Sequence, residues 1–333
     1  MNNLTLPAAV SRVSEMSFAD LYLGHRTLGN RFSSVPGAPA DPVIADATLS
    51  DDLAALEAEC KRITEASGAA DFKLDYDGMS YRVATMRAMR GTVFVLRKMV
   101  SEISSFEKLR FPSAYIPPLL AERMSGLFLI AGAMNSGKTT TAGTLIAERL
   151  RRFGGVAVTA EDPVELPLEG QHGPGVCFQT GVSRETGGFA EACRSLVRWG
   201  AKIIFLGEIR DGETAVEALR AGVNGHLVVS TLHAEDIQTG LRRIHSMATE
   251  TFDAASAQLL LADGLAGIVH QKLVGDDSRR LEIELLMLHD PSGQQAHHSA
   301  RAMIREGKFE RLASEIRLQQ AKMIQAGAMR SGG

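Results

Sequence analysis

The stretch that most constrains this chain is the run GAMNSGKT at residues 132–139. It fits the pattern G-x-x-x-x-G-K-[ST], in which glycines allow backbone N–H groups to turn inward around a polyphosphate. Residues 126–131, GLFLIA, predict a short buried strand before the run, and residues 139–152 predict a helix with one apolar face after it. A helix N-terminus at this point attracts an anion. The run therefore predicts a phosphate-binding loop between a strand and a helix.

The loop pattern also predicts which residues bind which group. Lys138 would neutralise the β- and γ-phosphates of a nucleotide, and the Thr139 hydroxyl would ligate Mg²⁺. Asn135 stands where many such loops carry glycine, and asparagine tolerates a positive φ angle. The sequence thus predicts ATP and Mg²⁺ as ligands. The predicted nucleotide contacts in the loop are Gly132, Asn135, Ser136, Gly137, Lys138, Thr139 and Thr140.

Composition limits the other function classes. A length of 333 residues predicts two domains, at about 150 residues per domain. The net charge of −3 supplies no global basic field, so we expect no direct binding to nucleic acid. No apolar run approaches the ~20 residues of a membrane span, and the N-terminus lacks the features of a signal peptide. Three widely separated cysteines argue against a disulfide framework or a zinc site, so we expect a cytoplasmic protein.

The chain divides by its hydrophobic patterns. Residues 1–104 predict a small α+β domain, because a helical pattern precedes β-like alternation around a turn at Asp77 and Gly78. Residues 105–118 contain three prolines and predict a linker. Residues 119–250 predict the nucleotide-binding core. Residues 251–326 predict a mainly helical C-terminal part, and residues 327–333 a disordered tail.

The core predicts a parallel sheet covered on both faces. Apolar runs at 156–159, 203–206 and 227–231 are each followed by polar residues and then by a helical pattern. Strands that alternate with helices in this way form parallel sheets, and working residues lie beyond the carboxyl ends of such strands.

Charged and polar side chains lie at the ends of these three strands. Glu161 and Glu165 follow the first, Glu208 follows the second, and His226 and His233 flank the third. Transfer of a phosphoryl group to water requires Mg²⁺, an oriented water and charge compensation, which carboxylates at adjacent strand ends can help to supply. Each segment alone could be a solvated turn or hold a structural histidine. Together, and in this order, they favour a nucleoside triphosphatase.

The four segments together resemble the secretion ATPase superfamily, the motors of type II secretion, type IV pili and type IV secretion. Residues 132–139 match its Walker A motif, 161–165 its aspartate box, 203–211 its Walker B segment and 225–233 its histidine box. The resemblance covers about residues 66–310. It implies an α/β, RecA-like P-loop NTPase core with a parallel sheet, preceded by a small α+β, PAS-like N-terminal domain and followed by a helical C-terminal extension.

The resemblance also implies roles for single residues. Glu165 would be the general base that activates water. Glu208 would act with Mg²⁺ and the γ-phosphate, and His226 and His233 would sense that phosphate.

The resemblance further implies a hexameric cytoplasmic ATPase. It would bind the inner membrane peripherally, through platform or secretion-channel proteins, and power type IV pilus dynamics or type IV secretion and conjugation. Residues 299–308 resemble the C-terminal motif of pilus retraction (twitching motility) ATPases, and the short architecture is shared with Dot/Icm-type and conjugative ATPases. The alternative is a nucleotide-gated, weakly hydrolytic assembly factor of a secretion complex. A small-molecule kinase is not favoured, because nothing resembles an acceptor site or lid.

Arginines gather on the stretch from residue 81 to 98. Arg82 and Arg90 would share one face if they lay on one strand. A solvated sheet face is one interpretation. The resemblance implies another, in which arginines of the N-terminal domain reach the nucleotide of the next subunit, and for this role we select Arg87, Arg90 and Arg97. Arginine suits it because its planar fork pairs with phosphate oxygens and stays charged.

Overall fold

The protein is described by a computed structural model that covers residues 10–38, 40–99, 102–182, 187–275, 280–288 and 298–331. The chain forms two compact units, residues 1–101 and 102–333. The division lies near the boundary predicted at residue 104.

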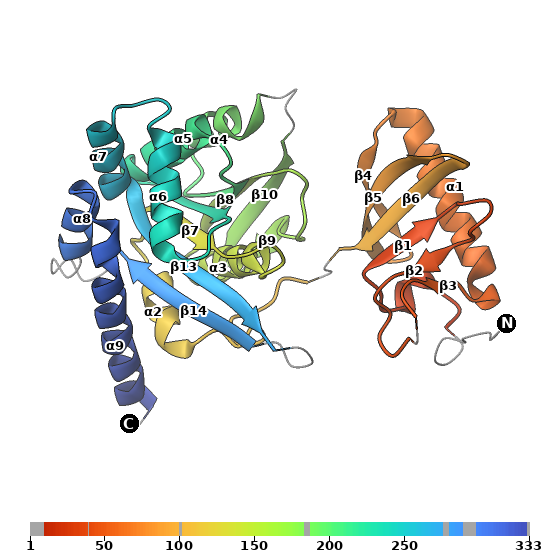
Figure 1. Cartoon of the computed structure of the whole chain (residues 1–333), viewed down its shortest axis with the longest axis horizontal. Coiled ribbons are helices and arrows are strands. Elements are labelled where there is room, and N and C mark those ends of the chain that lie inside the picture. Colours follow the sequence, from red (N-terminus) through yellow and green to blue (C-terminus); the bar gives the residue numbers. More distant parts are fainter. Residues whose placement is uncertain are drawn as a thin grey trace. The chain divides into compact units, whose positions relative to one another are not determined.

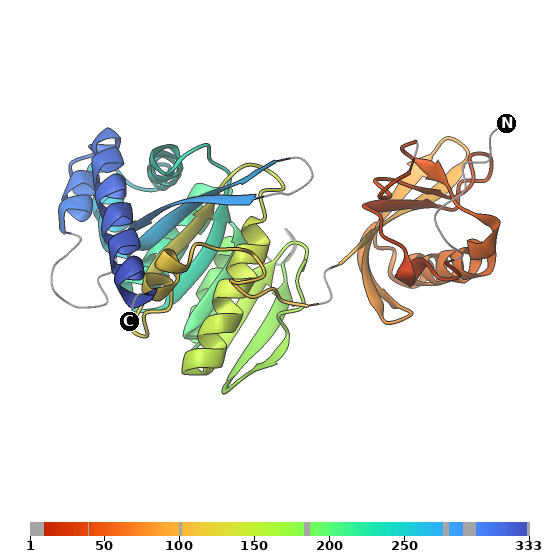
Figure 2. The same cartoon turned by 90° about the horizontal axis from the view of Figure 1, so that it is seen from below.

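Unit 1 contains an antiparallel sheet in the order β3-β2-β1-β6-β5-β4. Helix α1 packs against one face of this sheet, which makes the unit an α+β structure (Figures 1 and 2). The likeness to a PAS domain stays a prediction. The elements are β1 (Asp20–Leu23), β2 (Arg31–Phe32), β3 (Val43–Ile44), α1 (Ser50–Ser67), β4 (Asp71–Tyr76), β5 (Met79–Ala88) and β6 (Gly91–Lys98).

Local sequence explains the main features of unit 1. In α1, Leu53, Leu56 and Cys60 recur at helical spacing and are buried against the sheet. The β4–β5 hairpin turns where it was predicted, at Asp77 with φ 49° and Gly78 with φ 72°. Two consecutive positive φ angles are those of a type I′ turn, which suits the twist of the flanking strands.

Unit 2 is built on a mixed sheet in the order β14-β13-β7-β12-β11-β8-β10-β9. The five strands from β13 to β8, and β10, run parallel to their neighbours, whereas β14 and β9 are antiparallel to theirs. The core of the sheet is thus parallel, as predicted, and the two antiparallel edge strands make the whole sheet mixed. The strands are β7 (Gly126–Ala131), β8 (Gly155–Glu161), β9 (Gly170–His172), β10 (Gly175–Gly181), β11 (Ile203–Glu208), β12 (Leu227–Leu232), β13 (Leu265–Val274) and β14 (Arg280–Met287).

Two apolar clusters cover the two faces of this sheet. One joins the sheet to α4, α5, α6, α7 and α8, and the other joins it to α3 and to residues 106–124 (Figures 1 and 2). The helices are α2 (Ile116–Leu119), α3 (Lys138–Phe153), α4 (Gly188–Arg198), α5 (Gly212–Val223), α6 (Ile237–Ala248), α7 (Ala254–Gly264), α8 (His298–Arg305) and α9 (Leu312–Ser331). Helix α9 extends into the tail predicted for 327–333, and residues 332–333 lie outside the described part.

The segment 105–118, for which we predicted a linker, packs into unit 2. Phe106, Phe111 and Tyr115 are buried in the cluster that contains α3. The buried guanidinium of Arg149 on α3 donates to the carbonyls of Leu119 at 2.8 Å and Ala121 at 2.9 Å. Burial lowers the pKa of Arg149 to about 10. These hydrogen bonds hold the segment just before β7 against α3, the helix that follows the phosphate loop.

Strand β13 was not predicted, because residues 251–326 were expected to be mainly helical. Its first seven residues, Leu265–Gln271, are buried. It pairs in parallel with β7 as far as His270 and Ala131, and therefore passes beside the phosphate loop. A continuous apolar run of this length is compatible with either a buried helix or a buried strand, so periodicity alone does not separate them.

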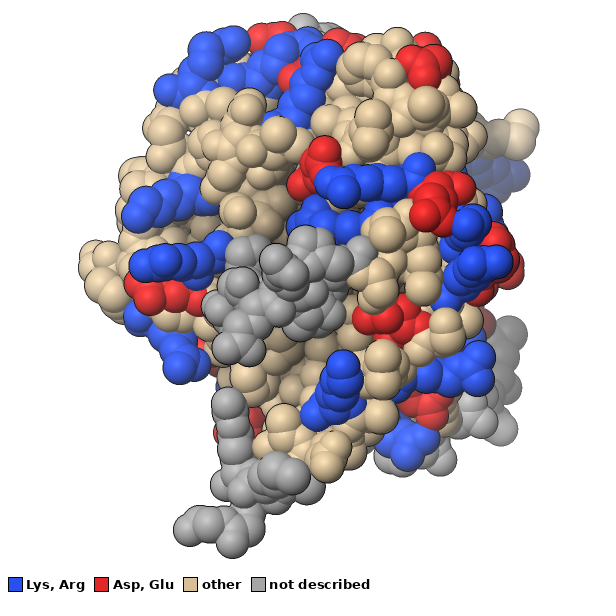
Figure 3. Space-filling model, turned by 90° about the vertical axis from the view of Figure 1, so that its left-hand side faces the viewer, with Lys and Arg blue, Asp and Glu red and all other residues tan. Residues whose placement is uncertain are grey.

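Helix α8 carries most of the C-terminal motif at residues 299–308. Arg301 donates to the carbonyl of Ala262, and Arg305 lies 2.5 Å from the carboxylate of Asp263. Both partners are in the last turn of α7, where the helix dipole is negative, so the arginines stabilise this helix end. On the side of unit 2 that carries α7, α8 and α9, basic side chains are interspersed with acidic ones (Figure 3).

Within the described ranges, none of the helices combines the length and the apolar character that a membrane span requires.

Candidate active site

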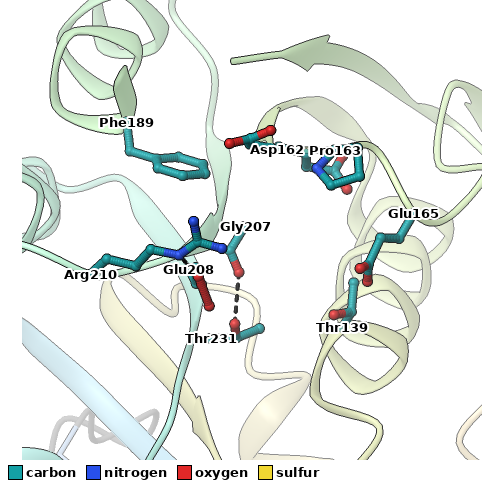
Figure 4. Close-up of a pocket in the computed structure, with 10 residues that line it drawn as sticks. Thr139, Asp162, Pro163, Glu165, Phe189, Gly207, Glu208, Arg210 and Thr231 are labelled. Carbon is teal, nitrogen blue, oxygen red and sulfur yellow. Dashed lines mark hydrogen bonds and ion pairs between the residues drawn. The ribbon is translucent and has the colours of Figure 1, made fainter. Parts of the chain in front are cut away.

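A pocket lies at the carboxyl ends of the central strands of unit 2 (Figure 4). The predicted segments after β7, β8 and β11 all contribute to it, together with the end of β12. The strands are parallel, which is why residues far apart in the sequence meet at this edge of the sheet. The lining residues are Thr139, Glu161, Asp162, Pro163, Glu165, Phe189, Gly207, Glu208, Arg210 and Thr231.

The phosphate loop has the backbone that its sequence predicts. Asn135 has φ 60° and Gly137 has φ 82°, so both are left-handed, and α3 begins at Lys138. The Nζ of Lys138 donates to the carbonyls of Gly132 at 3.2 Å and Ala133 at 2.7 Å. Burial lowers the pKa of Lys138, and the charge of Glu165 opposes this shift. The ammonium group is thus held inside the loop, at the N-terminus of a helix.

Four carboxylates line the pocket, and the three that the sequence singled out, Glu161, Glu165 and Glu208, lie in different environments. Glu161 is buried, which raises its pKa, and it accepts a hydrogen bond from Gln179 at 2.8 Å. Glu165 is exposed, and its side chain extends toward Thr139 (Figure 4). Glu208 forms an ion pair with Arg210. Of the three, Glu165 therefore has the best access to a water molecule, whereas Glu161 is held by the protein.

The structure separates the two predicted histidines. His233 follows β12 directly, and its ring lies between the phosphate loop and Glu208. His226 precedes β12, level with Gly126 at the start of β7, and its Nδ1 lies 2.7 Å from the Ala201 carbonyl. Because a six-residue strand spans about 20 Å, His226 lies at the opposite edge of the sheet from the loop. His226 is therefore too far from the phosphate loop of its own subunit to sense a γ-phosphate there, which corrects the expectation for this residue.

The residues present fit a magnesium ion held partly by a nucleotide. Thr139 and Glu208, the predicted ligands, line the same pocket and supply a hydroxyl and a carboxylate. Mg²⁺ prefers oxygen ligands and is usually bound through one or two protein groups together with substrate phosphates and water. In the described part of the chain, His, Cys, Asp and Glu form no group of three that could hold a metal alone.

The arginines of unit 1 do not share one face. Arg82 on β5 is directly opposite Arg97 on β6, so both lie on the same face, and both are exposed. Tyr81 and Val83 point to the other face, which α1 covers, and Arg87 has their parity. Arg90 lies in the β5–β6 turn rather than on a strand, so the condition under which Arg82 and Arg90 would share one strand face is not met.

Of the three arginines selected from the sequence, Arg97 is the one that lies on a strand and on the sheet face without α1. Its guanidinium binds the Asp20 carboxylate at 2.8 and 3.0 Å, with Asp20 directly opposite on β1. This pairing holds the side chain on the face that α1 leaves exposed.

Several residues at the site were missed by sequence reasoning. Arg210 belongs to the Walker B segment but was given no role, although it pairs with Glu208. His270, Gln271 and Lys272 lie on β13 beside the loop, since His270 is opposite Ala131, the last residue of β7. His270 and Lys272 line a second hollow with Gly132 and His233. The sequence does contain a signal for His270, Gln271 and Lys272, because they follow the apolar run at residues 265–269. The other strands of the core were recognised by the same pattern of an apolar run followed by polar residues.

Comparison with known proteins gives a consistent result. Residues 60–328 match the family described as "Type II/IV secretion system protein". The chain is 35% identical to the type II secretion system protein E of Xanthomonas campestris pv. campestris over 200 residues, which are 59% of this chain and 33% of that protein. It is 28% identical to the twitching motility protein of Neisseria gonorrhoeae over 276 residues, which are 80% of this chain and 68% of that protein.

Among solved structures, the fold is similar to that of the pilus retraction motor PilT with bound ADP. The TM-score is 0.75 at 27% sequence identity, and the alignment covers 92% of this chain and 87% of the PilT chain. The curated relatives are matched over only part of their length, which is about a third for the Xanthomonas protein.

Proposed function

The chain belongs to the type II/IV secretion system protein family, and we propose that it is an ATP hydrolase that drives a pilus or secretion machine. The observation that carries this proposal is the meeting of Thr139, Glu165 and Glu208 in one pocket, next to the ammonium of Lys138. Thr139 is a candidate metal ligand and Glu165 a candidate general base. Glu208 is a carboxylate that would act near the γ-phosphate, and Lys138 is a cation that would bind phosphate. Hydrolysis of ATP needs all four.

In the proposed reaction, the loop N–H groups and Lys138 bind the β- and γ-phosphates. Glu165 takes a proton from the attacking water, because it is exposed and its side chain extends toward Thr139. Thr139 and Glu208 would hold Mg²⁺, which would supply positive charge to neutralise the charge that develops on the phosphates. Glu208 acts on the γ-phosphate side, with His233 between it and Lys138.

We further propose that the protein works as a homo-hexamer in which arginines of unit 1 reach the nucleotide of the next subunit. Arg97 and Arg90 keep this role, since Arg97 is on the exposed sheet face and Arg90 is at a hairpin tip. Arg82 joins them, because it is directly opposite Arg97. Arg87 is also exposed, but its position in the alternation along β5 assigns it to the sheet face against which α1 packs, so we give it no such role.

The proposed cellular role is to power type IV pilus dynamics or a type IV secretion system from the cytoplasmic side of the inner membrane. Similarity to a twitching motility protein and to a pilus retraction motor supports the pilus branch. Residues 299–308, which resemble the C-terminal motif of pilus retraction ATPases, support it as well. Inner-membrane platform or secretion-channel proteins are the proposed partners.

A steady-state ATPase assay of the purified full-length protein tests the proposed function. We expect phosphate release that depends on Mg²⁺ and is lost in Glu208→Gln and in Lys138→Ala. Light scattering of the wild-type protein should give the mass of a hexamer. The second candidate, a nucleotide-gated assembly factor, is favoured by the ion pair that engages Glu208 with Arg210. ATP binding without phosphate release above that of Glu208→Gln would support the second candidate and contradict the first.

A further inference from the structure

Gln271 on β13 is tied to the phosphate loop. Its side-chain Nε2 donates to the backbone carbonyl of Ser136 at 2.6 Å, across a separation of 135 residues. The strand also approaches the start of the loop, because a Cβ added at Gly132 would lie 2.5 Å from the Gln271 carbonyl oxygen. At Gly137, an added Cβ would lie 3.4 Å from Nε2. Gln271 therefore contacts the loop near both of its ends.

This contact orients a peptide that belongs to the nucleotide site. The peptide unit between Ser136 and Gly137 is planar and trans, so its C=O and N–H groups point in opposite directions. With the carbonyl held toward β13, the Gly137 N–H is directed away from β13 and into the loop. The positive φ angles of Asn135 and Gly137 help to curve the backbone into an anion-binding concavity.

The burial of Gln271 shows that this position is not optimised for packing alone. Its side chain is fully buried, and its Oε1 has no hydrogen-bond partner among the described residues. The Ser136 hydroxyl is also buried and unpartnered there. A buried polar atom without a partner costs free energy, whereas methionine would fill a similar volume without that cost. An amide here is best explained by the hydrogen bond that it gives to the loop.

We propose that Gln271 is a positioning residue for the phosphate loop, which holds the Ser136–Gly137 peptide with its N–H toward the bound polyphosphate. The inference rests on the proposed function, since it assigns the loop a polyphosphate ligand. It also connects the nucleotide to β13, a strand that lies outside the four sequence motifs.

Gln271→Met tests the proposal, because it keeps the volume and removes the donor. Gln319→Met on α9 is the matched control. The Gln319 side chain is also buried, and its amide also bonds to the backbone of a residue far away in the sequence. The Met287 N–H donates to its Oε1 at 2.9 Å, and its Nε2 donates to the Met287 carbonyl at 3.1 Å. Dissociation constants for ADP and for pyrophosphate, which binds through its phosphates alone, are measured in the full-length protein, together with the melting temperature without ligand.

We expect Gln271→Met to weaken both ligands by roughly 3- to 30-fold, the range for one oriented hydrogen bond. Gln319→Met should lower the melting temperature and leave both dissociation constants within about twofold of wild type. Unchanged ADP and pyrophosphate binding in Gln271→Met would overturn the proposal and leave the proposed function intact. Wild-type protein that binds neither ligand would overturn both.

Discussion

The Nζ of Lys138 lies 3.5 Å from the Nδ1 of His233, and the Nε2 of the same ring lies 3.7 Å from a carboxylate oxygen of Glu208. Burial lowers the pKa of His233, and the charges of Lys138, Arg243 and Arg210 lower it further. The ring is therefore neutral near pH 7. Because an ammonium group can only donate, Nδ1 accepts from Lys138, and this places the ring proton on Nε2, toward Glu208. One imidazole thus connects the phosphate loop on β7 with the carboxylate on β11.

His233→Ala should slow ATP turnover by roughly tenfold or more, because it breaks the connection between Lys138 and Glu208. Nucleotide binding should largely persist. His226→Ala is the control, since that ring lies at the other edge of the sheet and bonds only to the Ala201 carbonyl among the contacts described for it. It should keep near wild-type turnover per folded molecule. A larger loss of kcat in His226→Ala than in His233→Ala would contradict the assignment.

Glu165→Gln should keep ATP binding and slow hydrolysis by about 10² to 10⁴, the usual contribution of a general base. Glu161→Gln should have a smaller effect, because Glu161 is buried and already bonded to Gln179. Single-turnover phosphate release at saturating ATP separates chemistry from binding. The reverse order of effects would mean that Glu161 is the base.

Mixed rings test whether Arg97 acts on the neighbouring nucleotide. Lys138→Ala subunits and Arg97→Ala subunits are each expected to be inactive alone. Mixed, they should recover part of the ATPase activity, because an intact loop can then face an intact arginine. Arg87→Ala, on the face that α1 covers, should stay active without mixing. Confirmed mixed rings without any recovery would exclude action in trans.

His270 should make the protein less stable as the pH falls. Burial and the charge of Lys272 lower the pKa of this imidazole, while the charges of Glu284 and Asp236 and a backbone hydrogen bond with Ala234 oppose the shift. The unfolded state takes up the proton first, near pH 6.5, so the free energy of unfolding decreases from about pH 6.5 down to the folded pKa.

The measurement is the denaturant unfolding midpoint at pH 7.5 and pH 5.5 for wild type and His270→Gln. We expect the variant to lose less stability between these two pH values. An identical loss in both proteins would mean that His270 does not contribute to the pH dependence.

Gly222→Ala should destabilise unit 2 by about 1–3 kcal/mol through overpacking. A Cβ at Gly222 of α5 would lie 2.6 Å from the Gly264 carbonyl oxygen and 2.9 Å from the Cα of Gly126. The control is Gly181→Ala, because a Cβ there meets nothing within 4 Å. Thermal unfolding measures both. Equal melting temperatures for the two variants would contradict the close packing of α5 on β7.

Sequence alone determined those features that depend on neighbours along the chain. The strand 126–131, the loop with its left-handed Asn135 and the helix beginning at Lys138 follow from local pattern and backbone preference. The meeting of Glu165 with Glu208 could also be predicted, because the carboxyl ends of parallel strands share one edge of a sheet.

Only the tertiary structure decided features that depend on strand register and on which elements pack together. His226 and His233 look equivalent in sequence, yet a strand places them at opposite edges of the sheet. Arg87 and Arg97 differ in the face that they occupy, because side chains alternate along a strand and the pairing of β5 with β6 fixes the parity. Gln271 contacts the loop only because β13 pairs with β7, a partnership between residues more than a hundred positions apart. Local propensity cannot encode such pairings, since the free energy that selects them comes from burying whole strands against each other.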